Sequence, residues 1–479
     1  MTETPWRAGG GRATIPREVP VLVVGAGPAG AVAALTLARH GVGCLLVDRR
    51  RVLSPLPRAT GLSLRSMELA RSWGLEEHLL AGAPEIDWTA WMGRVLSEPS
   101  SGVEFPAGQP TRAQSALLSP CAPACVAQAD LERLLVERLG DHDAVTFATG
   151  VAVTDVVADD AGVRAELRDR RAGRAVVVRA RHLVAADGVR GGLRRSLGIP
   201  VQRWDGLGER IGVQFRAPLW SRLGERRHVV YIVTHQDGHG SFIPAGRGDR
   251  WVYAREWDPA VEDIGDYRPS RVTALIRAGA GAPDLPVEIE RVVSLTYGAH
   301  LAAHFRAGPA FLAGDAAHRM TPRGGMGLNA AVQDGHDLGW KLAWVHHGWA
   351  GDALLDSYEA ERRPVASHLV ARSAAPELAR DPADELHIDL GGRIAHVWVP
   401  TGGGRRSTLD LLTDGLTLFC GPGGPPRGSC PTEPRPVPPV VERRLPLAAA
   451  RALGIRPGGA LLARPDGRPV AILPPPAHP

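Results

Sequence analysis

The segment that most constrains the fold is the glycine turn Gly25-Ala26-Gly27-Pro28-Ala29-Gly30, which stands between an apolar run and a helix-forming run. Residues 21–24 have the composition of a buried parallel strand, and residues 29–40 have helical length and strong helix formers. A second apolar run, 44–47, ends at Asp48. Strand, turn, helix and strand form a βαβ unit, so the chain is predicted to begin as an α/β protein with a parallel sheet.

The spacing of the three glycines is typical of a dinucleotide site. Gly25 permits a tight turn, Gly27 lets the backbone approach a pyrophosphate, and Gly30 lets the helix pack closely on the strand. The helix N-terminus, with Ala29 in its first turn, presents free N–H groups to phosphates. Asp48 can accept hydrogen bonds from an adenosine ribose. A glycine turn that serves packing alone is the alternative interpretation.

Two further strand-like runs also end in a glycine and a carboxylate. One ends at Asp187-Gly188 and the other at Gly314-Asp315, and the second leads through a glycine-rich turn, 321–329, into a helix. Three such strand ends are what a parallel sheet needs to hold a large dinucleotide along its carboxyl edge. Backbone N–H groups of the 324–329 turn would suit an electron-accepting ring that becomes anionic on reduction.

The remainder of the chain changes character twice. Residues 84–124 are irregular and rich in Pro, Ser, Gly and Trp, whereas residues 201–295 alternate as an antiparallel sheet with polar turns. Beyond residue 391 the composition shifts to Pro and Gly, which predicts a small third unit.

Composition excludes several classes of protein. The apolar fraction of 44% and the charged fraction of 22% are those of a globular protein. The net charge of +5 comes from scattered arginines, with Lys341 the only lysine, so no nucleic-acid partner is expected. No apolar run is long enough to span a membrane, and residues 1–18 read as a flexible lead-in rather than a secretory signal. We therefore expect a cytoplasmic protein with reduced cysteines and no metal site.

Taken together, these motifs resemble the group A FAD-dependent aromatic monooxygenases, the para-hydroxybenzoate hydroxylase superfamily. The resemblance spans nearly the whole chain and is strongest with the aromatic polyketide hydroxylases. It rests on residues 25–30, the Asp187-Gly188 pair, the run 314–318 followed by 324–329, and the run 334–342.

The resemblance implies a fold of three parts. A Rossmann-like, GR2-type FAD-binding domain would comprise residues 19–79, 126–200 and 291–390. Residues 80–125 and 201–290 would form an antiparallel-sheet substrate domain, and residues 391–479 a degenerate thioredoxin-like domain.

It also implies FAD as cofactor and NAD(P)H as co-substrate. The residues at matching positions, expected to bind the cofactor, are Gly25, Gly27, Ala29, Gly30, Asp48, Arg49, Arg58, Gln128, Asp187, Gly314, Asp315, Pro322, Gly325, Gly327, Leu328 and Asn329.

The chain departs from the family pattern at several of these motifs. Asp48 replaces the usual Glu, Gly191 replaces the usual Ser after the Asp187-Gly188 pair, and Thr321 replaces the first of two prolines. Arg323 is a bulky cation beside the flavin turn. Arg323 is the one candidate for a catalytic side chain that contacts the substrate. The alternative is that Arg323 is solvent-exposed and has no catalytic role.

The substrate cavity is expected between the flavin sheet and the 201–295 sheet. Five side chains are candidates for lining it: Tyr231, His235, Phe242, Tyr253 and Trp257. Because strand side chains alternate between two faces, core packing explains each of them equally well.

The function implied is oxygenation of a phenolic or polycyclic, polyketide-like substrate by O2 through a flavin hydroperoxide, with FAD reduced by NAD(P)H. Baeyer–Villiger oxygen insertion on a quinone-type polyketide is an alternative within the same chemistry. A flavin-fold protein that binds an intermediate without oxygenating it is the alternative from another class. The substrate, the choice of NADH or NADPH and the oligomeric state stay open.

Overall fold

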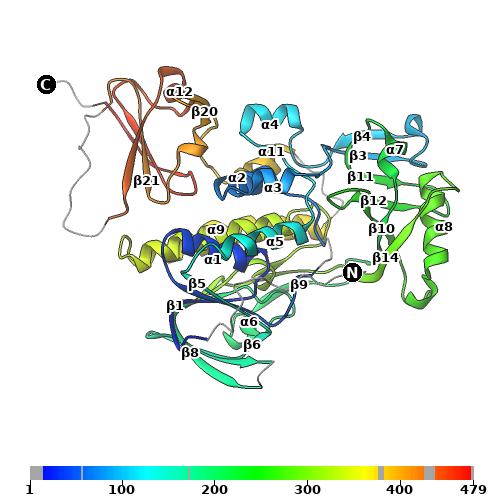
Figure 1. Cartoon of the computed structure of the whole chain (residues 1–479), viewed down its shortest axis with the longest axis horizontal. Helices are drawn as coiled ribbons and strands as arrows, with labels where there is room; N and C mark the ends of the chain where they lie inside the picture. The colour runs from blue at the N-terminus through cyan, green and yellow to red at the C-terminus, as the bar shows by residue number, and fades with distance from the viewer. Residues whose placement is uncertain (1–14, 55–57, 171–172, 376–381, 425–436, 476–479) are drawn as a thin grey trace.

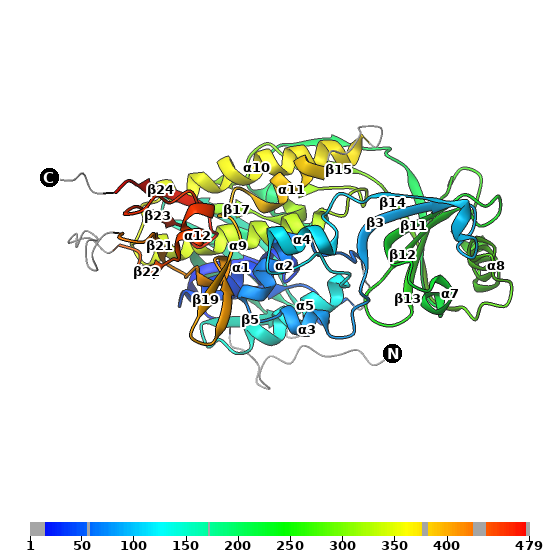
Figure 2. The same cartoon turned by 90° about the horizontal axis from the view of Figure 1, so that it is seen from above.

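The computed structural model describes residues 15–54, 58–170, 173–375, 382–424 and 437–475. Most of the predicted lead-in over residues 1–18 therefore lies outside the described residues. Three sheet-containing bodies stand in a row, with the largest in the middle (Figures 1 and 2). None of the helices in the described part of the chain is long and apolar enough to cross a membrane.

The central body is built on an eight-stranded sheet. Its strands are β1 (Glu18–Val24), β2 (Cys44–Asp48), β5 (Val145–Thr149), β6 (Val151–Asp159), β7 (Gly162–Asp169), β8 (Ala175–Ala185), β16 (Arg306–Ala307) and β17 (Ala310–Leu312). The order β17-β8-β1-β2-β5 is parallel throughout, with Val24 opposite both Val47 and Ala185, and Leu312 opposite Ala185. The strand ends at Asp48, Ala185 and Leu312 therefore meet at one edge, as predicted.

Helices α1, α5 and α9 pack side by side against one face of this sheet (Figure 1). Helices α1 and α9 approach closely because α9 has glycines where it faces α1. A Cβ on Gly335 would lie 2.2 Å from the carbonyl oxygen of Ala29, and one on Gly339 would lie 2.6 Å from Cβ of Thr36. This places the N-terminus of α9 beside that of α1. The helices of this body are α1 (Pro28–Arg39), α2 (Leu64–Ser72), α3 (Glu76–Leu80), α5 (Gln128–Leu139), α6 (Leu193–Ser196), α9 (Gly327–His346), α10 (Ala353–Ala374), α11 (Pro382–Leu390) and the 3-10 turn η3 (Gly314–Ala316).

The second body is a seven-stranded sheet in the order β14-β10-β13-β12-β11-β3-β4. Its strands are β3 (Asp87–Gly93), β4 (Val103–Pro106), β10 (Glu209–Arg216), β11 (His228–Val233), β12 (Gly240–Pro244), β13 (Arg250–Glu256) and β14 (Glu288–Thr296). It also contains α7 (Leu219–Leu223), α8 (Pro269–Ala280), η1 (Pro99–Ser101) and η2 (Ile264–Asp266). Helix α4 (Arg112–Leu118) lies over α2 of the central body (Figures 1 and 2).

The sheet predicted over residues 201–295 is confirmed, with one correction. The segment read as irregular, 84–124, supplies β3 and β4, and β3 pairs with β11 in parallel. The strands β3 and β4 are short and lie among turn residues, so the local sequence does not reveal them. The partner strand β11 also lies more than 130 residues away, so no local pattern indicates the pairing.

A three-stranded sheet, β18-β15-β9, lies where the chain crosses between these two bodies, formed by β9 (Val201–Trp204), β15 (Ala299–Ala302) and β18 (His318–Arg319). The third body holds the hairpin β19 (Trp398–Thr401) and β20 (Gly404–Ser407) and the sheet β22-β21-β23-β24. That sheet is formed by β21 (Leu416–Cys420), β22 (Val440–Arg444), β23 (Ala460–Ala463) and β24 (Pro469–Leu473), with α12 (Leu447–Ala452) and η4 (Leu409–Leu411) beside it.

Candidate functional site

A cavity of about 1660 Å³ opens at the carboxyl edge of the central sheet and continues to the face of the second sheet. All of the predicted cofactor residues except Gly30 line it, namely Gly25, Gly27, Ala29, Asp48, Arg49, Arg58, Gln128, Asp187, Gly314, Asp315, Pro322, Gly325, Gly327, Leu328 and Asn329. Arg323 lines it as well. Ligand pockets usually occupy about 300–1,000 Å³, so this cavity has room for more than one ligand.

The glycines of the first turn do three different things. Gly25 has φ +103° and donates its N–H to Val47 across 2.8 Å, which closes the turn onto β2. A Cβ on Gly30 would lie 1.9 Å from the carbonyl oxygen of Gly25. Gly30 therefore allows α1 to pack closely against the turn, and it does not line the cavity. A Cβ on Gly27 would meet nothing within 4 Å. Open space over Gly27 fits the close approach of a pyrophosphate.

Asp48 is buried at the end of β2, and its carboxylate already accepts four hydrogen bonds. Ala26 donates its N–H across 2.9 Å, and Arg50 donates its N–H across 2.7 Å and two guanidinium bonds of 3.1 and 3.0 Å. A carboxylate offers about four acceptor positions, so a ribose hydroxyl would have to displace a bond from Arg50. The sequence interpretation did not include Arg50, although it stands two residues beyond the strand end.

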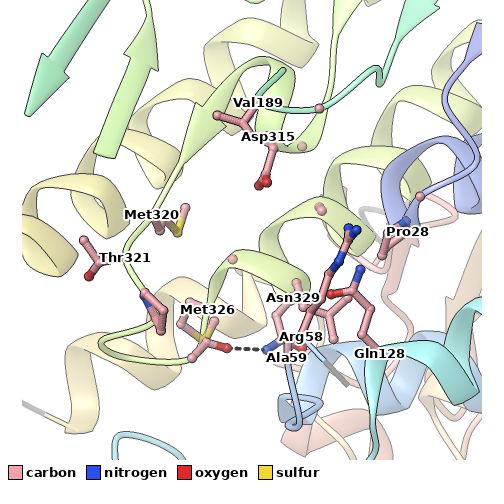
Figure 3. A pocket seen from close by; sticks show the side chains of 18 of the residues that line it. Pro28, Arg58, Ala59, Gln128, Val189, Asp315, Met320, Thr321, Met326 and Asn329 are labelled. Atoms are coloured by element: carbon pink, nitrogen blue, oxygen red, sulfur yellow. Dashed lines mark hydrogen bonds between the residues drawn. The ribbon is translucent and has the colours of Figure 1, made fainter. Parts of the chain in front are cut away.

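Arg58 and Gln128 project from one side of the cavity, and Asp315 projects from the other (Figure 3). Gln128 donates its amide N–H to Glu132 across 2.7 Å, and burial raises the pKa of the Glu132 carboxyl. Asp315 is exposed to the cavity but otherwise surrounded by protein, and this desolvation raises the pKa of its carboxyl. Glu132 is a further lining residue that the sequence interpretation missed.

Asp187 follows β8, and its carboxylate lies against its own loop. Oδ2 accepts the N–H of Leu193 across 3.1 Å, and a Cβ on Gly191 would lie 1.9 Å from that same oxygen. The carboxylate therefore occupies the space that a side chain at residue 191 would need. Glycine in place of the family's serine permits this conformation. Burial raises the pKa of the Asp187 carboxyl.

The turn before α9 is fixed by the side chain of Asn329. Its Nδ2 donates to the carbonyl oxygens of Gly325 (3.0 Å, dashed in Figure 3) and Gly61 (3.2 Å), and its Oδ1 accepts the N–H of Ser63 across 2.8 Å. The positive φ of Gly324 (+99°) and Gly325 (+67°) allows this tight approach. The free N–H groups of the first turn of α9 are left to the cavity.

Core packing, the alternative explanation, holds for four of the five aromatic and histidine candidates for the substrate wall. Tyr231, Phe242 and Tyr253 are fully buried on the opposite face of the second sheet, and Trp257 packs at the edge of that same core. His235 lies in the turn after β11, where its Nδ1 accepts the N–H groups of Asp237 and Gly238. None of the five lines the cavity.

The residues that do face the cavity are the alternate, smaller members of the same strands. They include Val230 and Ile232 on β11, Ser241 and Ile243 on β12, and Ala254 on β13. Helix α8 covers the other face, and the large aromatic side chains pack beneath it because they bury the most apolar surface there. Alternation was predicted correctly, and the choice of face, which the sequence left open, is settled by the packing of α8.

One group of carboxylates elsewhere has metal-like spacing. Asp337, Glu361 and Asp466 bring an oxygen each within 4.8 Å of one another. These oxygens are bonded to cations: Lys341 donates to Asp337 and Glu361, and Arg464 pairs with Glu361 and Asp466. The cluster joins the third body to α9 and α10 as an ion-pair network.

The family model of the FAD binding domain matches residues 18–373 of this chain. The chain belongs to the FAD binding domain family. It is 34% identical over 469 residues to tetracenomycin A2 monooxygenase-dioxygenase of Streptomyces glaucescens, covering 85% of this chain and 83% of the relative. It is 36% identical over 475 residues to aklavinone 12-hydroxylase DnrF of Streptomyces peucetius, covering 88% and 95%.

Two solved structures of flavin-dependent enzymes are similar to this chain along nearly its whole length. The flavin-dependent monooxygenase PieE, in complex with FAD and substrate, superimposes with a TM-score of 0.83 at 25% identity over 96% of both chains. Aklavinone-11 hydroxylase with FAD and aklavinone gives 0.82 at 31% identity over 97% of both. The chain is thus an FAD-dependent aromatic monooxygenase, and the predicted family, central fold, enzyme class and cofactor are confirmed.

Proposed function

We propose that this enzyme uses NAD(P)H and O2 to hydroxylate a polycyclic phenolic substrate of the aromatic polyketide kind. The observation that carries the proposal is the continuity of the cavity, which joins the dinucleotide edge of the central sheet to an apolar wall on the second sheet. The relatives named above, which include an aklavinone 12-hydroxylase, support a multi-ring substrate.

The lining residues divide into two sets under this proposal. Gly27 and the N-terminus of α1 would hold the pyrophosphate, and Asp48 the adenosine ribose. Asp315 and Arg58 would hold the ribityl part, and the first N–H groups of α9 would face the flavin ring. When bound, FAD supplies electron transfer from NAD(P)H and the activation of O2.

The second set forms the substrate wall. Trp88 and Ala90 on β3 and Val230, Ile232 and Ile243 on β11 and β12 make it apolar. Such a wall orients a flat ring system by contact and excludes water from the reacting face, which strengthens electrostatic interactions in the cavity. The chain's own contribution is therefore orientation and desolvation.

The division into an FAD-binding domain, a middle domain and a thioredoxin-like C-terminal domain, at the boundaries given above, is also our proposal. The three largest hydrophobic clusters of the described residues, one in each body, support it.

The first test is NAD(P)H consumption by FAD-loaded enzyme in air, with and without a multi-ring phenol, followed by mass analysis of the product. We expect substrate-stimulated consumption and a product heavier by one oxygen atom, with the label retained from 18O2. Oxygen inserted between ring carbons would favour the Baeyer–Villiger alternative. Tight ligand binding with no consumption across a broad aromatic panel would favour the non-oxygenating binding protein.

A further inference from the structure

A buried carboxylate on α11 lies behind the cavity and does not reach it. Asp389 is 1% exposed, and it accepts three hydrogen bonds from two other segments of the chain. Its Oδ1 accepts the hydroxyl of Ser63 across 2.7 Å and the amide N–H of Gln333 across 2.9 Å, and its Oδ2 accepts the backbone N–H of Arg65 across 3.0 Å. None of these four residues lines the cavity. Asp389 can therefore act on a ligand in the cavity only through other residues.

The bond from Ser63 leads to the turn before α9. The backbone N–H of Ser63 donates to Oδ1 of Asn329 across 2.8 Å. The amide of Asn329 donates in turn to the carbonyl oxygens of Gly325 and Gly61, and these last three residues line the cavity (Figure 3). Asp389 thus fixes Ser63, and Ser63 fixes the side chain that shapes the turn.

The bond from Gln333 leads to the turn that carries Asp315. Oε1 of Gln333 accepts a bond from Nη1 of Arg362 across 3.2 Å, and Nε of Arg362 donates to Oδ1 of Asp334 across 2.8 Å. The other oxygen of Asp334 accepts the N–H of Gly314 across 3.1 Å. Both Gly314 and Asp315 line the cavity. The same buried carboxylate is therefore connected to a second turn of the cavity wall.

The donors to this carboxylate are uncharged. Among the residues that the structure describes, no arginine, lysine or histidine side chain pairs with Asp389. The guanidinium of Arg65 donates instead to Glu68 and to the carbonyl oxygen of Asp466. A buried carboxylate that has no cation beside it depends on its hydrogen bonds, because each missing bond costs desolvation free energy. Asp389 therefore holds its two side-chain donors, Ser63 and Gln333, in fixed positions.

We infer that Asp389 is a positioning residue for FAD, because it holds the turn before α9 and the Gly314–Asp315 turn in register with each other. The inference rests on the FAD position proposed above and not on the substrate or the reaction. A cofactor that contacts both turns at once needs them in a fixed relative position, and a displacement of about 1 Å is enough to misplace such contacts. Asp389 itself touches neither the cofactor nor the reacting atoms.

The test is the affinity for FAD and the visible spectrum of the FAD-saturated enzyme, both measured without NAD(P)H or substrate. D389N keeps the size of the side chain and replaces one acceptor by a donor. We expect it to raise the Kd of FAD about tenfold, the equivalent of one lost hydrogen bond. It should also shift the flavin absorption bands, which respond to the groups around the ring.

S63A and Q333L each remove one of the two connections. Both should raise the Kd of FAD. S63A should shift the flavin bands more than Q333L does, because Ser63 leads to the turn that faces the ring. Since both connections pass through Asp389, the effect of S63A or Q333L on the Kd should be smaller in the D389N background. We expect each double variant to fall at least about threefold short of the product of the separate effects.

T408V is the matched control. Thr408 is buried as deeply as Asp389, and its hydroxyl donates to Ala395 and accepts from Val397, all within the third body. Loss of this hydroxyl should lower the stability of the protein but leave the Kd of FAD and the flavin spectrum unchanged.

The outcomes separate this inference from the proposed function. An unchanged Kd and spectrum in D389N would overturn the inference, as would an equal change in T408V or fully additive double variants. If D389N does not fold, the S63A–Q333L double variant decides: a non-additive effect on the Kd supports the inference and an additive one overturns it. A natural protein that shows the expected FAD effects but never oxygenates a phenol would overturn the proposed function and leave the role of Asp389 standing.

Discussion

His318 and Asp334 form a fully buried pair, with Nε2 and Oδ2 2.6 Å apart, directly behind the turn that carries Asp315. The same oxygen of Asp334 accepts the N–H of Gly314 across 3.1 Å, and its other oxygen accepts from Arg362 across 2.8 Å. Burial alone would raise the pKa of the Asp334 carboxyl, but His318 and Arg362 outweigh it and hold that pKa below its usual value. The ionised carboxylate thus fixes the turn from behind.

D334N should therefore loosen the flavin site without touching its surface. Removing one charge from a buried pair leaves the partner uncompensated, which costs about 3–5 kcal/mol of unfolding free energy. We expect that loss in urea denaturation, together with weaker FAD binding by equilibrium dialysis. D356N, which removes a largely exposed carboxylate on α10, should change neither. Equal stability of D334N and the natural protein would contradict the assignment.

Gly27 and Gly30 should respond to alanine in opposite ways. G30A forces a Cβ against the carbonyl oxygen of Gly25, so the apoprotein should lose stability by about 1–3 kcal/mol. G27A meets no protein atom, so apoprotein stability should stay within about 0.5 kcal/mol while FAD affinity falls. Thermal melts with and without FAD separate the two effects. A G27A protein that binds FAD normally would exclude the proposed pyrophosphate position.

The orientation of β11 can be tested at neighbouring residues. I232W fills the cavity, so we expect turnover of a multi-ring phenol to fall at least about tenfold while FAD binding is retained. Y231F removes a hydroxyl that donates to the carbonyl oxygen of Arg226 and accepts the N–H of His228, on the opposite face. It should cost about 1–3 kcal/mol of stability and leave KM unchanged. Reversed outcomes would mean that the sheet faces the other way.

Asp389 should make stability depend on pH in an unusual direction. It is buried under Ser63 and Gln333, and burial raises the pKa of its carboxyl from 3.8 to about 6. Because the folded pKa lies above the unfolded one, its stabilising contribution is complete below pH 4 and is lost as the pH rises through 6. This difference in pKa between the folded and unfolded states corresponds to about 3 kcal/mol of unfolding free energy.

D389N should abolish this pH dependence. Urea midpoints measured from pH 4 to 7 should therefore decline less in D389N than in the natural protein, whatever constant offset the altered hydrogen bonds introduce. D384N, on the exposed side of the same helix, is the control. Parallel curves for D389N and the natural protein would show that the Asp389 carboxyl does not titrate in this range.

The βαβ start, the dinucleotide edge and the family could all be predicted from the amino-acid sequence. Those features are local, because the glycine spacing at Gly25, Gly27 and Gly30 and the acids at strand ends follow from backbone geometry within a few residues. The alternation of β11 to β13 is equally local.

Which face of those strands lines the cavity depends on long-range packing and could not be predicted from the sequence. Helix α8 covers one face and draws Tyr231, Phe242 and Tyr253 beneath it, and no local pattern encodes that choice. The same holds for the fourfold bonding of Asp48, the His318–Asp334 pair and the bonds of Asp389 to two other segments. Side chains from distant segments acquire partners only when the chain packs, and burial then sets their charge and hydrogen bonding.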